Sequence, residues 1–272
     1  MGSNVLQRLE TRALPPPVVR ITVVDAKGSV PRGVGTTMTV SATATQGTIG
    51  GGHLEFKAIE IARSMLESGD ARAVRRFPLG AALGQCCGGV VHLSFDLIAD
   101  LSQTPPRRPG FQVMLFGAGH VGRAVVETLS TLDCSITWVD SRGEQFPKEV
   151  GANVACITTD LPECEIDHAA VGCWFIVMTH SHALDLALSE RILRRADYAY
   201  FGLIGSVTKR RQFERRLTDR DISAAKLNTM RCPIGLAGVV GKEPATIAIA
   251  VAAEIILLRS HAQTSNVAAG AI

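Results

Sequence analysis

The feature that most constrains this chain is a glycine pattern between two apolar segments. Residues 111–117, "FQVMLFG", predict a buried strand, and Gly117, Gly119 and Gly122 then follow in the spacing GxGxxG where a helix opens. The first glycine permits a tight turn, the second lets backbone approach a phosphate, and the third packs helix on strand. The next apolar segment, "SITWVD", ends at Asp140. This succession predicts a Rossmann-type fold.

Alternation of strands and helices continues to the end of this region. Predicted strands cover residues 135–140, 152–159, 173–179 and 198–205, and predicted helices cover 120–132 and 183–196. Such alternation indicates a parallel sheet covered by helices, so the fold class is α/β.

The region before it reads differently. Predicted strands cover residues 18–26, 36–40, 73–77 and 90–98, with one helix over 54–70. We expect a smaller α+β domain over residues 1–98, a proline-rich linker over 99–110, and the Rossmann-type domain over 111–272.

Composition narrows the function classes. The 272 residues carry a formal net charge of +3, which is too little for a general nucleic-acid binder. Seven cysteines form an odd set, and the N-terminus has no basic-then-apolar export signal, so we expect a reduced, cytoplasmic protein. The most apolar stretch, Pro244–Leu258, is short for a membrane span and contains Glu254. It predicts a buried core helix and no membrane contact.

The carboxyl ends of the predicted parallel strands carry candidate ligand-binding residues, as open α/β sheets bind ligands there. We expect a phosphate-bearing ligand at Gly117–Gly122, with His120 either facing the phosphate or simply beginning the helix. Asp140 stands about where such folds place the carboxylate that receives ribose hydroxyls. Later strands add further polar candidates to the same edge: Thr179, His180, His182, Asp185, Ser206, Lys209 and Arg210.

The first domain has two candidate loops of its own. Pro31, Gly33 and Gly35 constrain a loop around Arg32, which suits a phosphate or carboxylate but equally a solvated surface. Gly50, Gly51 and Gly52 run directly into a helix and predict a second anion-receiving helix start, unless they serve only close packing.

The stretch "GQCCGG" places Cys86 and Cys87 side by side after Gln85. Neighbouring Cα atoms lie about 3.8 Å apart, below the roughly 4.4 Å at which ordinary disulfides begin, so both are expected to be thiols. On an extended strand they point to opposite faces, so one can pack while the other meets a ligand. Thiolates are soft metal ligands, although cysteine is often only a small buried hydrophobe.

Seven stretches, taken in order, resemble one known family. They are "GSVPRGVGTTMTV", "GTIGGGHLE", "LGQCCGG", "LFGAGHVGRAV", "THSHALD", "FGLIGSVTKRRQFERRL" and "PIGLAGVVGKEPATIAIAVAAEI". The series spans about Val18 to Ile256 and is similar to the xanthine dehydrogenase accessory proteins, the XdhC/CoxI family. Asp221 departs from the pattern, because the family tends to have glycine there.

The resemblance implies a chaperone for molybdenum cofactor that performs no turnover itself. It implies that the chain binds the molybdopterin form, supports its sulfuration with a cysteine desulfurase, and delivers it to the molybdenum-binding subunit of apo xanthine dehydrogenase. It further implies a homodimer, and a cofactor or molybdenum contact at Cys86 or Cys87, between which the sequence does not choose.

Two other functions compete with this reading. An NAD(P)-dependent oxidoreductase is favoured by GxGxxG with Asp140, but it needs a proton-transfer group that no Lys-Tyr or His-Asp arrangement after the later strands supplies. We therefore expect no resident NAD(P). A structural adaptor with a vacant pocket is the third reading, and the density of glycine loops argues against it.

Overall fold

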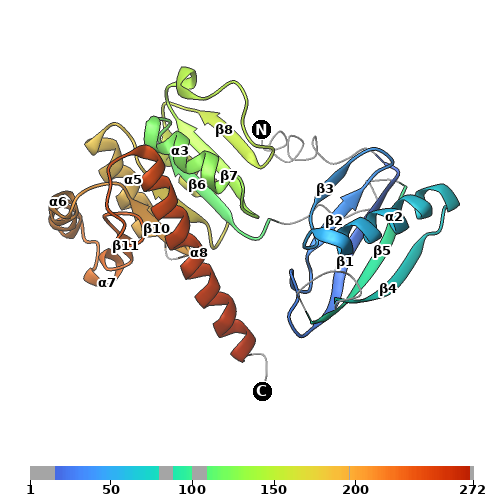
Figure 1. The fold of residues 1–272 in the computed structure, drawn as a ribbon. Coiled ribbons are helices and arrows are strands. Elements are labelled where there is room, and N and C mark those ends of the chain that lie inside the picture. The colour runs from blue at the N-terminus through green and yellow to red at the C-terminus, as the bar shows by residue number, and fades with distance from the viewer. Residues whose placement is uncertain (1–15, 80–87, 100–108, 196, 270–272) are drawn as a thin grey trace. The chain divides into compact units, whose positions relative to one another are not determined.

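The computed structural model describes residues 16–79, 88–99, 109–195 and 197–269. These residues fall into two compact units, an N-terminal one within residues 10–107 and a C-terminal one within residues 108–272. Figure 1 shows the helices and strands of both.

The N-terminal unit is an antiparallel sheet with one helix packed on it. Its strands are β1 (Val18–Lys27), β2 (Thr37–Val40), β3 (Thr45–Gly47), β4 (Arg72–Pro78) and β5 (Val90–Ile98), in the order β3-β2-β1-β5-β4. The helix α2 (Gly52–Ser68) buries Leu54, Ala58, Ala62 and Met65. Because these four lie on one stripe of the helix, they meet the alternate side chains Val19, Ile21 and Val23 of β1 in one core.

The C-terminal unit is a parallel sheet of six strands. They are β6 (Gln112–Phe116), β7 (Ser135–Asp140), β8 (Val154–Thr158), β9 (Trp174–Val177), β10 (Tyr200–Leu203) and β11 (Met230–Arg231), in the order β11-β10-β9-β6-β7-β8. The chain changes direction across the sheet between β6 and β9. A crevice at the carboxyl ends of two such strands is the usual ligand site of this fold.

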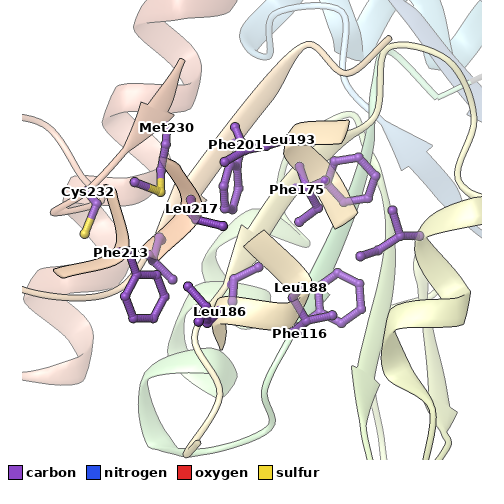
Figure 2. Close-up of a cluster of buried hydrophobic side chains, with 14 of the residues drawn as sticks. Phe116, Phe175, Leu186, Leu188, Leu193, Phe201, Phe213, Leu217, Met230 and Cys232 are labelled. Atoms are coloured by element: carbon purple, nitrogen blue, oxygen red, sulfur yellow. The ribbon is translucent and has the colours of Figure 1, made fainter. Parts of the chain in front are cut away.

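Helices cover both faces of this sheet. One face carries α3 (His120–Leu129) and α8 (Pro244–Ala269), and the other carries α4 (Pro162–His168), α5 (His182–Arg194), α6 (Val207–Thr218) and the short α7 (Ala224–Leu227). A 3-10 turn, η4 (Gly143–Gln145), stands between β7 and β8 in place of a crossover helix. Figure 2 shows the core on the α5 and α6 side, where Phe116, Phe175, Phe201 and Phe213 are buried. The predicted α/β class with two different domains is confirmed.

The last helix corrects one expectation. It extends to Ala269, because no glycine or proline occurs from Ala245 to Ala269 to end it. Over Pro244–Ala262 the helix is long and apolar enough to cross a membrane by length and composition alone. Of its most apolar 18-residue segment, 28% is buried. One side packs beside α3, whereas Ile249 and Ile256 are exposed. It is therefore a half-buried helix and not the buried core helix that its composition predicted.

Candidate functional site

The three glycines of the GxGxxG pattern have different surroundings. Gly117 has a φ of +115°, and a Cβ there would lie 2.3 Å from the Met178 carbonyl oxygen. A Cβ on Gly122 would lie 2.0 Å from the Gly117 carbonyl oxygen, which also accepts a hydrogen bond from Trp138 Nε1 at 2.9 Å. A Cβ on Gly119 would have no described atom within 4 Å. Packing therefore requires the first and third glycines, and open space lies in front of the second.

Asp140 is bonded to the same loop. It is only 6% exposed, and its Oδ2 accepts hydrogen bonds from the Ala118 amide at 2.6 Å and Arg142 Nη2 at 3.0 Å. Its Oδ1 accepts from the Arg142 amide at 2.9 Å and Arg142 Nε at 3.0 Å. Burial alone would raise the pKa of Asp140, but the hydrogen bonds from Arg142 and Ala118 outweigh it and hold the pKa below its ordinary value. Asp140 is thus an ionised internal acceptor.

A buried ion pair supports the carboxyl ends of β9 and β10. Asp185, fully buried on α5, accepts from Lys209 Nζ at 2.6 Å, and its other oxygen accepts from the Thr179 amide and hydroxyl at 3.0 and 2.7 Å. Lys209 Nζ also donates to the Ile204 carbonyl at 2.8 Å. The expectation that Lys209 binds a ligand phosphate is therefore corrected, because its ammonium group is buried and engaged by the protein.

Other predicted residues at this edge divide into structural and exposed ones. Ser206 is the N-cap of α6, where its hydroxyl accepts from the Lys209 amide at 3.2 Å. His120 and His180 are exposed, and His180 lines a cavity of about 10 Å³ with Asp140 and Gly117. In the described part of the chain no group of three His, Cys, Asp or Glu side chains could hold a metal ion.

In the N-terminal unit, the predicted loops converge at one end of the sheet. A Cβ on Gly50 would lie 2.5 Å from Pro31 Cγ, so the Arg32 loop packs directly on the triple-glycine loop. A Cβ on Gly89 would lie 2.4 Å from the Ser29 carbonyl oxygen, which places the end of the "GQCCGG" stretch against the same loop. Arg32 itself is exposed.

The triple-glycine loop already holds a carboxylate of the protein. Glu55 Oε2 accepts from the amides of Ile49 and Gly51 at 3.2 and 3.1 Å and from the Thr48 hydroxyl at 2.5 Å. The Gly50 amide donates to the Thr48 hydroxyl oxygen at 3.1 Å. Glu55 in the first turn of α2 also complements the helix dipole. An external anion at this loop would have to use other donors.

Gln85, Cys86 and Cys87 lie outside the described residues, so their assignment stays a prediction from the sequence. Among the described cysteines, Cys134, Cys173 and Cys232 are buried, Cys156 is intermediate and Cys164 is exposed on α4. Burial raises the pKa of the Cys134 and Cys232 thiols to about 11 and that of Cys173 to about 12.

Sequence reasoning missed two contributors to the C-terminal unit. Arg142 donates hydrogen bonds to both carboxylate oxygens of Asp140. The sequence feature that could have indicated this pairing is an arginine two residues after the acid that ends a strand. Glu254 on α8 accepts from the Tyr200 hydroxyl at 2.7 Å and the Gly235 amide at 2.9 Å, which ties α8 to β10 and to the loop after β11. Nothing in the sequence pairs Glu254 with residues so distant.

Comparison with known proteins supplies the family context. Residues 113–255 match the model of the XdhC Rossmann domain, and residues 12–78 match the model of the XdhC and CoxI family. The protein YqeB of Escherichia coli (strain K12), described as uncharacterized, is 28% identical over 259 residues. The match covers 90% of this chain but 44% of YqeB, so the chain spans less than half of that relative's length.

A solved structure of a bacterial protein matches along most of the chain. It is a Bacillus halodurans crystal structure described as a xanthine dehydrogenase, with a TM-score of 0.72, 18% sequence identity, and coverage of 94% of this chain and 96% of that one. At this identity the likeness shows a shared fold and no more.

Proposed function

The chain belongs to the XdhC and CoxI family, and from this membership we propose that it is an accessory protein that carries molybdenum cofactor. In this proposal it binds the molybdopterin form of the cofactor as cargo, supports exchange of an oxo ligand for sulfur, and delivers the product to apo xanthine dehydrogenase. It performs no turnover of its own.

The observation that carries the proposal is the match of two separate family models, one in each structural unit. A Rossmann-type domain alone is found with many unrelated functions, so the second model is what makes the assignment specific.

The geometry of the C-terminal unit is compatible with a phosphate-bearing cargo. Free amides at the start of α3 and the open space before Gly119 suit the phosphate of molybdopterin. Exposed His120 and Arg123 add basic character beside them. From the sequence alone, Cys86 or Cys87 is the residue that we propose to contact the metal, because a thiolate is a soft ligand.

The rival function, an NAD(P)-dependent oxidoreductase, loses its main support. It relied on Asp140 to receive ribose hydroxyls, and Asp140 accepts hydrogen bonds from Ala118 and Arg142 instead. We propose that the protein holds no resident NAD(P).

Partners and location follow from the same proposal. We expect the chain to contact the molybdenum-binding subunit of xanthine dehydrogenase and a cysteine desulfurase, to act as a homodimer, and to work in the cytoplasm without binding nucleic acid or membrane.

Substitution of the two vicinal cysteines by alanine tests the proposal. Purified protein is incubated with molybdenum cofactor and passed through gel filtration, and the retained pterin is measured by fluorescence after oxidation. We expect pterin retention to fall about tenfold in at least one of the single variants Cys86→Ala and Cys87→Ala, and in the double variant. Loss of a thiolate contact to the metal should cost more than about 1 kcal/mol of binding free energy. Reactivation of apo xanthine dehydrogenase should fall in parallel.

Cys164→Ala is the matched control, since it removes an exposed thiol elsewhere in the chain. The buried thiols compete little, because their raised pKa values keep them protonated at neutral pH. Full retention and reactivation in both single variants and in the double variant would remove the cysteine assignment. Equal retention of NAD and molybdenum cofactor by the unmodified protein would instead favour the oxidoreductase.

A further inference from the structure

Arg142 occupies the acceptor positions that a dinucleotide ribose normally uses. In this fold the carboxylate at the end of the second strand receives ribose hydroxyls. Here the backbone amide and guanidinium of Arg142, together with the Ala118 amide, donate four hydrogen bonds to Asp140, two to each oxygen. Two oxygens of a carboxylate offer about four lone-pair positions. A ribose diol would therefore have to displace Arg142.

The surroundings leave little room for such a displacement inside the protein. Asp140 is 6% exposed, and the cavity it lines with Gly117 and His180 has a volume of about 10 Å³, roughly the space of one water molecule. The contact between Ala118 and Asp140 also fixes the glycine loop to the end of β7. The acceptor positions of Asp140 are thus closed to a ribose diol by the chain's own Arg142 and Ala118.

Arg142 nevertheless keeps hydrogen-bonding capacity for a ligand. Its side chain is 33% exposed. Only Nε and one Nη2 hydrogen are used on Asp140, and within the described residues the remaining guanidinium N–H groups donate to no acceptor. A guanidinium with free planar donors suits a phosphate or another oxyanion.

Charged groups of both signs surround the guanidinium of Arg142. Arg123 on α3 reaches the same side, where its Nη2 donates to the Gln145 carbonyl at 2.9 Å. The negative charge of Asp140 is compensated by Arg142, and Glu144 is the acidic residue that interacts with Arg142 from η4. Arginine beside this strand end is also how some Rossmann-type proteins accommodate a ribose 2′-phosphate.

We propose that Arg142 determines the ligand specificity of the Gly117–Gly122 loop: it excludes ligands that need a carboxylate for a ribose diol and selects ligands that bring an additional oxyanion to this strand end. The inference rests on the proposed function only in taking the loop as a site for a phosphate-bearing ligand.

The test compares NAD+ with NADP+, because the two probes differ only by the 2′-phosphate. Isothermal titration calorimetry at fixed salt gives the dissociation constant of each for the full chain, for Arg142→Ala and for Arg123→Ala. We expect the unmodified protein to prefer NADP+ by about tenfold, the worth of one charge-assisted hydrogen bond. In Arg142→Ala the preference should disappear or reverse, because NADP+ loses its partner and NAD+ gains a free Asp140.

Arg123→Ala is the matched control, since it removes an equal charge near the loop but leaves Asp140 bonded. It should weaken both probes and change their ratio less than Arg142→Ala does. Arg142→Lys covers the case in which Arg142→Ala fails to fold: lysine keeps the charge but cannot fill the same acceptor positions, so NAD+ affinity should rise while NADP+ binding persists.

Three results would overturn the inference. The first is equal affinity of the unmodified protein for NAD+ and NADP+, and the second is an unchanged ratio of the two dissociation constants in Arg142→Ala, or in Arg142→Lys if the alanine variant does not fold. The third is a change of this ratio in Arg123→Ala as large as the change in the Arg142 variant. If the unmodified protein binds neither probe, gain of NAD+ binding in the folded Arg142 variant supports the inference and absence of gain overturns it. Pterin retention, measured separately on the unmodified protein, tests the proposed function, so either proposal can fail while the other stands.

Discussion

At the residue scale, the glycines of one motif serve two purposes that their spacing does not distinguish. Gly117 and Gly122 are needed because the carbonyl oxygens of Met178 and Gly117 lie where their Cβ atoms would be. Gly119 has an ordinary φ of −70° and open space before it, so no contact in the described residues demands a glycine there. The requirement at Gly119 is then expected to come from a ligand.

Alanine at these positions separates packing from binding. We predict that Gly119→Ala costs about 1 kcal/mol of unfolding free energy or less, since alanine accepts this backbone conformation and is only a poorer N-cap. Its methyl group would enter the open space and lower pterin retention at least about tenfold. Gly122→Ala should cost about 3 kcal/mol, because its Cβ overlaps a backbone oxygen.

Urea denaturation and cofactor retention measure the two effects on the same preparations. A Gly119→Ala protein with unchanged retention would show that this glycine faces no ligand. Gly122→Ala provides the stability reference, and a negligible loss in that variant would contradict the observed packing.

At the element scale, the end of α6 holds an aspartate, Asp221, in the left-handed conformation that its side chain disfavours. The Asp221 amide donates to the Thr218 carbonyl at 3.0 Å, and the Ile222 amide donates to the Leu217 carbonyl at 3.1 Å. This is the Schellman arrangement, and Leu217 and Ile222 supply its hydrophobic contact. Asp221, with φ of +62°, is the left-handed residue and the only non-glycine residue with positive φ in the described chain.

A glycine at position 221 would therefore suit the backbone better than aspartate does. We predict that Asp221→Gly raises the unfolding free energy of the C-terminal unit by about 1 kcal/mol, the usual cost of a side chain in the left-handed region. Asp219→Gly is the matched control, because Asp219 has right-handed helical angles. It should lower stability instead. Urea denaturation measures the unfolding free energy of both variants. A decrease of similar size in both would contradict the left-handed assignment of Asp221.

At the scale of the whole molecule, the two units differ in their cores and in the pKa values of their carboxylates. The N-terminal core lies between its sheet and α2, whereas the C-terminal unit has a core on each face of its sheet. Both tryptophans of the chain, Trp138 and Trp174, are buried in the C-terminal unit. The carboxylates whose pKa values are lowered also lie there: Asp140, Asp167, Glu190 and Asp197. Tryptophan emission therefore reports the unit that acid should weaken.

We predict that the C-terminal unit loses stability as the pH falls below about 4. A carboxylate whose pKa is lower in the folded state stabilises fully above its unfolded pKa, and this contribution is lost as the pH falls through the folded value. Asp140→Asn should reduce stability at pH 7 and flatten part of the acid loss, as measured by tryptophan emission in urea at each pH. Glu60→Gln, on the exposed face of α2, is the control and should leave the profile unchanged. An identical acid slope in Asp140→Asn and the unmodified protein would contradict the role of Asp140.

The sequence by itself determined the architecture of this protein. Local patterns were enough, because apolar segments, a glycine turn and alternating helices specify a parallel sheet with few alternatives. "SITWVD" predicted β7 from Ser135 to Asp140 with both ends correct. The short helix α4 was missed, since seven residues with acidic side chains give too little periodicity to recognise.

Only the tertiary structure decided which polar groups are available to a ligand. Asp140, Lys209 and Glu55 each belong to a motif that suggests binding, yet Arg142, Asp185 and the amides before α2 engage them inside the protein. The Lys209–Asp185 pair joins two helices, so only packing of those helices brings its members together. Arg142 and the amides before α2 lie close in sequence to Asp140 and Glu55, but it is the folded backbone that turns them toward these carboxylates. The sequence shows where charged and polar groups occur along the chain, whereas the partner of each buried charge is set by the folded structure.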